Sequence, residues 1–198
     1  MLPPSDVAYR IDATDRIVTV SDGWVSFAEA NGGERVLPPR ILGTSLWSSI
    51  ADSATREVYR VMLGRVRKGV GAVRFQFRCD SPDVRRLLEM QVTVSGGDEV
   101  AFQTHLVQSQ PRTEVGALHS DTTRSEAILT ICGWCMQVPV NGEWLEIEEA
   151  ITALGLFAGS ATPQLSHGMC PACYSTMMAT LDDPALSAGG QVTVGALP

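Results

Sequence analysis

The chain has 198 residues, of which 44% are hydrophobic and 19% are charged, so it has enough apolar matter for a folded core. All 15 Lys and Arg residues lie at or before Arg124, where 15 acidic residues balance them. The net charge of −7 therefore falls on residues 125–198, which hold seven acids and no base. Because protein binds the nucleic-acid backbone largely through Lys and Arg, we expect no direct binding of nucleic acid there.

The chain also lacks the features of a membrane or secreted protein. No apolar run approaches the roughly 20 residues that cross a bilayer. The first ten residues, MLPPSDVAYR, do not combine a basic segment with an apolar one, as a secretory signal does. We expect a cytoplasmic protein without membrane contact.

The first elements predicted along the chain are a hairpin and two helices. Apolar and polar residues alternate from Val7 to Val20 around a turn at 13–16, which indicates two paired strands. Ser21 and Asp22 can cap a short helix. A longer helix is predicted over Ala54 to Lys68, where apolar residues recur at spacings of three and four.

A second alternating region predicts three strands in a meander. They cover Val73 to Cys79, Leu88 to Val94 and Val100 to Leu106, with glycine-rich turn residues at 95–98. Two strands, a helical crossover and three strands indicate the α+β class, with a five-stranded antiparallel sheet and flanking helices.

Three motifs and this order of elements resemble a bacterial PAS domain over about residues 7 to 107. The motifs are Ser21-Asp22-Gly23-Trp24, Gly43-Thr44-Ser45-Leu46-Trp47 and the run from Arg74 to Asp83. PAS domains sense small ligands or cofactors and form dimers in signalling proteins. The resemblance implies signal input without catalysis, and a homodimer. It names no ligand, because the cysteine motif of flavin-binding PAS domains and a haem-ligating histidine at 51–69 are missing.

The shared apolar phase of the strands and the long helix predicts which residues enclose a ligand pocket. These residues are Val58, Val61, Met62, Phe75, Phe77, Met90, Val92 and Phe102.

Four of the five cysteines form two CxxC pairs, Cys132 with Cys135 and Cys170 with Cys173. A two-residue spacer lets both sulfurs of a pair reach one ion, so the pattern predicts a four-thiolate zinc site. The 34 residues between the pairs must fold, and Trp144, Ile147, Ile151 and Leu154 recur there at helical spacing. A last helix is predicted from Pro171 to Leu181.

The second half also resembles a cysteine-rich module that follows PAS or receiver domains in bacterial signalling proteins. The pattern joins the two CxxC pairs, Trp144 with Glu148-Glu149, and Ser166-His167-Gly168. The resemblance makes the four cysteines metal ligands. Since four sulfurs complete a tetrahedron, we expect His167 to support the ligands or a turn, although it could also replace one thiolate.

The sequence thus predicts four regions. They are a PAS-like sensor domain at 1–110, a linker at 111–127, a four-cysteine zinc module at 128–181 and a tail at 182–198. The favoured function is non-enzymatic regulation through contact with another signalling protein. The alternative is a thiol redox switch or a dithiol oxidoreductase that uses the CxxC pairs.

Overall fold

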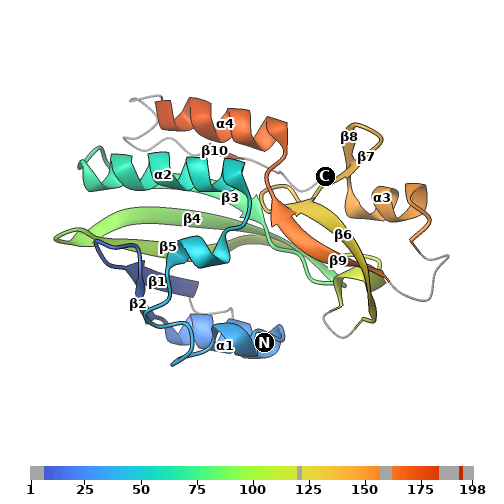
Figure 1. The fold of residues 1–198 in the computed structure, drawn as a ribbon, viewed down its shortest axis with the longest axis horizontal. Coiled ribbons are helices and arrows are strands. Elements are labelled where there is room, and N and C mark those ends of the chain that lie inside the picture. Colours follow the sequence, from blue (N-terminus) through green and yellow to red (C-terminus); the bar gives the residue numbers. More distant parts are fainter. Residues whose placement is uncertain (1–6, 120–121, 157–161, 183–191, 194–198) are drawn as a thin grey trace.

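The computed structural model describes residues 7–119, 122–156, 162–182 and 192–193. Its largest element is a sheet with the order β10-β3-β4-β5-β1-β2 (Figure 1). Five of these strands are antiparallel: β1 (Val7–Ile11), β2 (Ile17–Val20), β3 (Val73–Arg78), β4 (Val84–Gly96) and β5 (Glu99–Pro111). The predicted α+β class, with a five-stranded antiparallel sheet, is confirmed.

The tail predicted at 182–198 lies mostly outside the described residues. Asp182 ends a helix, and β10 (Val192–Thr193) pairs in parallel with β3.

The helical crossover between β2 and β3 contains α1 (Asp22–Ala30) and α2 (Ser53–Arg67). Asp52 caps α2, because its carboxylate accepts a hydrogen bond of 2.7 Å from the Thr55 amide. Gly69 follows the helix with φ +73°, a conformation that glycine adopts without strain. Short 3₁₀ helices lie at Glu34–Val36 (η1), Leu46–Ser49 (η2) and Gly116–Leu118 (η3). In Figure 1, α2 lies over the sheet, and α1 lies beside the hairpin of β1 and β2.

The second part of the chain has two small sheets and two helices. The strands are β6 (Arg124–Cys132), β7 (Val138–Val140), β8 (Glu143–Leu145) and β9 (Thr162–Gly168), and the helices are α3 (Ile147–Ala153) and α4 (Pro171–Asp182). β6 pairs in parallel with β9, and β7 forms a hairpin with β8. Asn141 and Gly142 turn this hairpin with φ of 51° and 91°.

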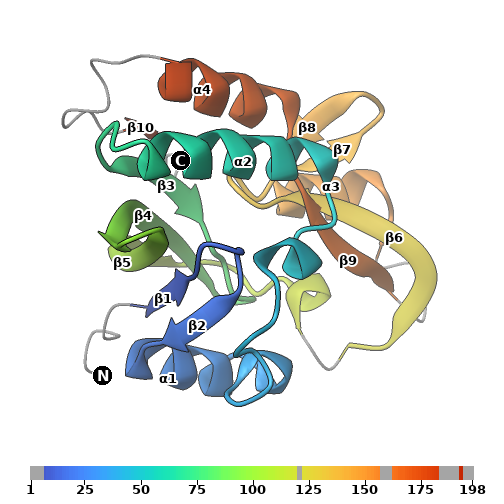
Figure 2. The same ribbon diagram turned by 60° about the vertical axis from the view of Figure 1, so that its left-hand side comes forward.

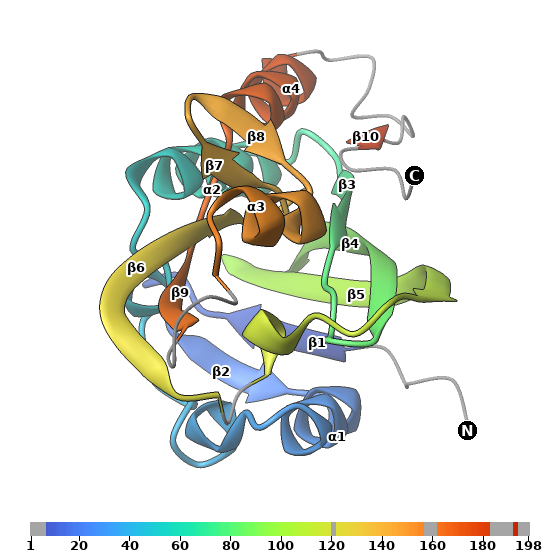
Figure 3. The same ribbon diagram turned by 90° about the vertical axis from the view of Figure 1, so that its right-hand side faces the viewer.

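The two parts of the chain pack together. α4 lies beside α2 (Figure 2), and the curved β6 and β9 stand next to the sheet (Figure 3). One set of buried residues, which we name the shared core, joins apolar side chains of the sheet and α2 to those around the cysteines. Its members include Ile11, Val58, Met62, Phe75, Val92, Phe102, Cys132, Trp134, Cys135, Cys170, Cys173 and Met177.

A second core lies within the C-terminal part and extends into the predicted linker. Val115 and Ala117 from that linker pack with Ile131, Ile147 and other apolar residues. The segment 111–127 also holds the start of β6. The predicted linker is polar in composition, but two of its residues, Val115 and Ala117, are buried. The domain boundaries stay a prediction, although both cores tie the neighbouring regions together.

Among the described residues, no helix has the length and apolar character that crossing a membrane requires.

Candidate metal centre

The sulfur atoms of Cys132, Cys135, Cys170 and Cys173 lie within 4.8 Å of one another, and all four residues are buried. The Sγ atoms of Cys135 and Cys170 are 3.8 Å apart. A tetrahedral zinc ion with Zn–S bonds of about 2.3 Å places its sulfurs about 3.8 Å apart. The four predicted ligands therefore come together in an arrangement that fits a tetrahedral metal ion.

The first CxxC pair lies on a tight turn at the end of β6. The Met136 amide donates to the Cys132 carbonyl over 2.9 Å, and the Cys132 amide donates to the Gln137 carbonyl over 2.8 Å. Met136 has a φ of 62°, in the left-handed region that non-glycine residues seldom adopt. This turn brings the chain back so that the Cys135 sulfur reaches the centre.

The second pair lies at the start of α4. The Cys173 amide donates to the Cys170 sulfur, and the Cys170 amide donates to the Cys132 sulfur, each over 3.4 Å. Pro171 is the first residue of the helix, where its missing amide costs no helical hydrogen bond. The amides at this end thus stabilise negative charge on sulfur.

The parallel pairing of β6 with β9 closes the 34-residue gap between the pairs. Its register places Cys132 opposite Gly168, and the Gly133 amide donates to the Gly168 carbonyl over 2.9 Å. The chain then needs two more residues to reach Cys170. The strand pairing thus positions the second CxxC against the first.

The electrostatics of the cluster favour a bound cation. The thiols of Cys135 and Cys173 donate to the Cys132 sulfur, which lowers the pKa of Cys132 to about 2. Because the thiols of Cys135 and Cys173 donate these hydrogen bonds, the pKa of Cys135 is raised to about 12 and that of Cys173 is raised as well. Without a cation, a thiolate at Cys132 is therefore stabilised by protonated neighbours. Four thiolates in so small a buried space require a cation in place of those protons.

Trp134 connects this centre to the sheet. Its side chain is buried and stacks on Phe75, with ring centroids 5.9 Å apart, and it meets Tyr59 edge-on at 6.3 Å. Its carbonyl accepts a hydrogen bond of 2.8 Å from the Arg78 amide at the end of β3. Trp134, one of the two residues between Cys132 and Cys135, therefore belongs to the shared core.

The structure also places the other predicted site residues. Of the predicted pocket residues, Val58, Met62, Phe75, Met90, Val92 and Phe102 are buried in the shared core, and Val61 and Phe77 are partly buried against it. These residues all belong to or pack against one core, in which Trp134 stacks on Phe75. Whether these residues enclose a ligand stays a prediction.

His167 lies on β9 opposite Ile131, with an exposed side chain, and it is outside the four-sulfur group. Its expected supporting role stays a prediction.

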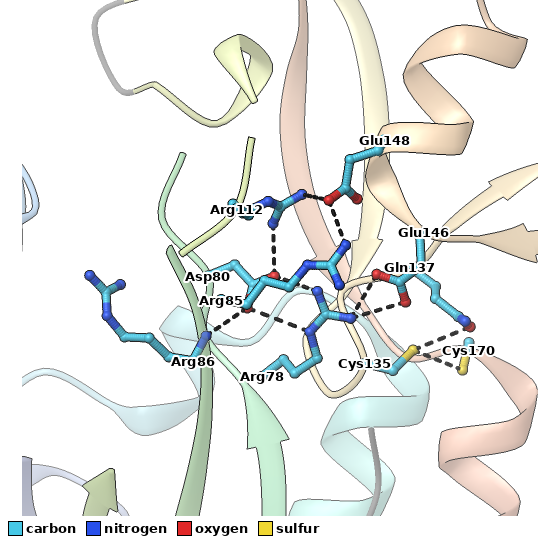
Figure 4. Close-up of polar contacts among 10 residues, drawn as sticks. All are labelled: Arg78, Asp80, Arg85, Arg86, Arg112, Cys135, Gln137, Glu146, Glu148 and Cys170. Atoms are coloured by element: carbon cyan, nitrogen blue, oxygen red, sulfur yellow. Dashed lines mark hydrogen bonds and ion pairs between the residues drawn. The ribbon is translucent and has the colours of Figure 1, made fainter. Parts of the chain in front are cut away.

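A buried cluster of charges was not predicted from the sequence (Figure 4). Arg78 and Asp80 have fully buried side chains and form an ion pair. Arg78 Nη1 lies 2.8 Å from Glu146 Oε2, beside α3, and Arg112 Nη1 lies 2.9 Å from Asp80 Oδ2. The cluster joins the end of β3 to the C-terminal part.

Glu148 extends this cluster towards the surface. Its Oε1 atom is 2.6 Å from Arg85 Nη2 and from Arg112 Nη2. The distribution of charged residues along the sequence gives one indication of these contacts. Because no base follows Arg124, any buried acid of the C-terminal part must find its arginine earlier in the chain.

We expect Glu148 to make stability depend on pH. Burial raises the pKa of this carboxyl, but the hydrogen bond from Arg85 and the charge of Arg112 outweigh it and lower the pKa overall. A carboxyl with a lowered folded-state pKa stabilises the protein above its unfolded pKa, about 4.3, and loses this effect as pH falls through the folded pKa. Urea unfolding should therefore show that the wild-type protein loses stability more steeply below about pH 4.3 than the Glu148→Gln variant does.

The exposed neighbour Glu149 provides the matched control, since Glu149→Gln removes the same charge one residue away. All three proteins keep the four cysteines, so acid release of a metal affects them equally. Equal pH slopes in the wild type and Glu148→Gln would contradict the prediction.

The fold and the site define an α+β chain with a buried four-thiol centre of the kind that holds a metal ion. No protein-family model and no curated protein matches this chain. Among solved structures, it is similar to a domain of an HTR-like protein from Haloarcula marismortui ATCC 43049. The identity is 17%, the TM-score is 0.37, and the match covers 52% of this chain and 98% of that one. A likeness of this degree carries no argument about function, which rests on the residues of the chain itself.

Proposed function

We propose that this chain is a non-enzymatic regulatory protein of the PAS-like sensory type, in which a four-cysteine zinc module is docked on the sensor sheet. It acts by contact with a signalling partner and as a homodimer. The observation that carries the proposal is the buried four-sulfur cluster packed, through Trp134, against the sheet.

The order of elements supports the sensory part of the proposal. Two strands, a helical crossover and a three-stranded meander carry the resemblance to PAS domains in the sequence, and the same order builds the observed sheet. The homodimer and the signalling partner follow from that resemblance alone.

Zinc is the metal that best suits the cluster. Four thiolates in a tetrahedron form a closed site of the structural type, with no open position for a substrate. Thiolate ligands select zinc or an iron–sulfur centre over harder ions such as Mg²⁺ or Ca²⁺. Zinc also has no redox chemistry of its own, which suits a site that supports a fold.

The burial of the cysteines argues against the redox alternative. Cys132 has no exposed surface, and Cys135, the most accessible of the four, is only 8% exposed. A dithiol oxidoreductase must present its attacking sulfur to another protein, and a redox sensor must meet its oxidant. These sulfurs instead lie buried within 4.8 Å of one another.

The first test is the metal content of the purified full chain. Native mass spectrometry should show one zinc ion per chain that is lost on denaturation, and the same spectrum reports whether the chain is a dimer. Zinc should stay bound during mild peroxide treatment, because the site is closed. A chain that carries no metal as isolated and gains none on adding zinc overturns the proposal, whereas rapid release by peroxide favours the redox switch.

A further inference from the structure

A second place in the fold has the features of a binding site. A cavity of about 580 Å³ lies between α1, the turn from β3 to β4 and the segment that follows β5. Its size falls in the range of small-molecule sites, about 300–1,000 Å³. The apolar part of its wall includes Phe27, Pro82 and Leu118. It is separate from the four cysteines and from the predicted pocket in the shared core.

The wall of this cavity contains a cation without an ion-pair partner among the described residues. Arg86 donates its backbone amide to Asp80 Oδ1 over 3.2 Å, but its guanidinium makes no ion pair or hydrogen bond within the described parts of the chain. Figure 4 shows its side chain directed away from the charge cluster, in contrast to Arg78, Arg85 and Arg112. A guanidinium offers five donors in a planar fork that matches a carboxylate.

The acids in the same wall already have partners. Asp80 pairs with Arg78 and Arg112, Glu114 Oε1 lies 2.7 Å from His119 Nε2, and Asp83 accepts a hydrogen bond from Ser81 Oγ. Arg86 is therefore the arginine of this wall for which the described residues supply no acid. An inorganic anion would use the guanidinium but leave the apolar wall in contact with water, whereas a neutral apolar molecule would do the reverse.

We propose that this cavity binds a small organic carboxylate, with its carboxylate on Arg86 and its apolar body against Phe27 and Leu118. Binding there reaches the C-terminal part through a short path, because Asp80 lies in the cavity wall and binds Arg78, which binds Glu146 beside α3. The cavity thus provides an input site for the sensor. This sensory role rests on the function proposed above, whereas the binding itself does not.

The test is a titration of the ¹⁵N-labelled full chain with short aliphatic and aryl carboxylates, benzoate and phenylacetate among them. The matching neutral amides and sodium sulfate are titrated in parallel. We expect carboxylates to shift the amide signals of Gly32, Ser81 and Arg86 in a saturable way. The neutral amide ligands should bind at least about tenfold more weakly than the carboxylates, since a hydrogen bond to a charged group contributes about 1.5–3 kcal/mol.

Variants at the cation test its role directly. Arg86→Gln should weaken carboxylate binding about tenfold or more, and Arg86→Lys should restore part of it. Arg35→Gln is the matched control, because Arg35 is exposed and lies outside the cavity wall. Thermal unfolding of each variant establishes that it is folded before the titration.

The outcomes separate the site from its role. Three results would each contradict the proposed site. They are the absence of saturable carboxylate binding, equal affinity for the neutral amide ligands or for sulfate, and unchanged carboxylate binding by Arg86→Gln. Hydrogen exchange at residues 146–153 tests transmission. A carboxylate that binds through Arg86 without changing this exchange keeps the site and removes its sensory role.

Discussion

Cys170→Ser is expected to remove the metal and to unfold the part of the chain around the cysteines. Structural zinc in zinc-finger peptides contributes about 10–16 kcal/mol at neutral pH. This is comparable with the entire stability of a typical domain, about 5–15 kcal/mol. The Cys170 amide and sulfur both belong to the cluster, so the substitution breaks the centre where α4 begins. Residues 124–182 should lose their slow hydrogen exchange.

The effect should extend into part of the sheet. The linker predicted at 111–127 would by itself let the N-terminal domain survive this loss as a separate unit. The shared core changes this expectation, because Trp134 lies against Phe75 and Tyr59. We expect faster exchange in β3 and α2, which flank Trp134, and retained protection in β2 at the far edge of the sheet.

Cys79→Ser is the matched control, since Cys79 lies outside the four-sulfur cluster. It should keep one zinc ion per chain and native tryptophan fluorescence. Cys170→Ser should bind no zinc and show a red-shifted emission as Trp134 becomes exposed. A Cys170→Ser protein with native exchange at residues 124–182 would show that the metal does not support this fold.

Local patterns predicted the N-terminal elements well because those elements depend on neighbours in the sequence. The hairpin from Val7 to Val20 and the meander from Val73 onward show a recognisable alternation of apolar and polar residues, and the predicted helix at 54–68 closely matches α2 at 53–67. Their hydrophobic period defines both the element and its buried face. The α+β class follows from their order.

Pairings between distant residues were harder to predict. β6 and β9 join residues more than 30 positions apart, and neither strand has a clear alternation of buried and exposed residues. Trp144 has helical spacing with Ile147 and Ile151 but lies on β8, because Asn141 and Gly142 first turn a hairpin. A helical period alone does not report such a turn.

In the candidate site, too, the features set by local spacing could be predicted and those set by distant contacts could not. CxxC spacing predicted all four sulfurs, because two residues between cysteines are a local requirement of metal geometry. The contact of Trp134 with Phe75 and the ion pairs of Arg78 depend on how the two parts dock. Buried arginine is rare, so the sequence at the end of β3 gives no local indication that Arg78 and the nearby Asp80 are buried.

Arg78→Met is expected to lower the free energy of unfolding by about 3–5 kcal/mol, because it removes a fully buried cation that pairs with two acids. Asp80 retains Arg112, but Glu146 loses the guanidinium 2.8 Å away. Methionine is a long apolar side chain that can occupy part of the space, so the loss is mainly electrostatic. Urea unfolding of the full chain measures it.

Arg85→Met is the matched control for this prediction. Arg85 pairs with Glu148 of α3, two residues after the partner of Arg78, but the side chains of Arg85 and Glu148 are 18% and 33% exposed. A pair that water reaches contributes about 0–1 kcal/mol, so this variant should lose far less stability than Arg78→Met. Equal losses would show that burial does not set the strength of the cluster.

The double variant Arg78→Met with Glu146→Met tests whether the two parts are coupled through this pair. Removing both charges eliminates the unpaired Glu146, so the double variant should recover stability relative to the sum of the single variants. The recovery should be accompanied by restored hydrogen-exchange protection at α3, because an apolar contact replaces the ion pair that holds it to β3. Strict additivity of the two substitutions would mean that Arg78 stabilises β3 alone, and that docking of the C-terminal part depends on Trp134 and α4.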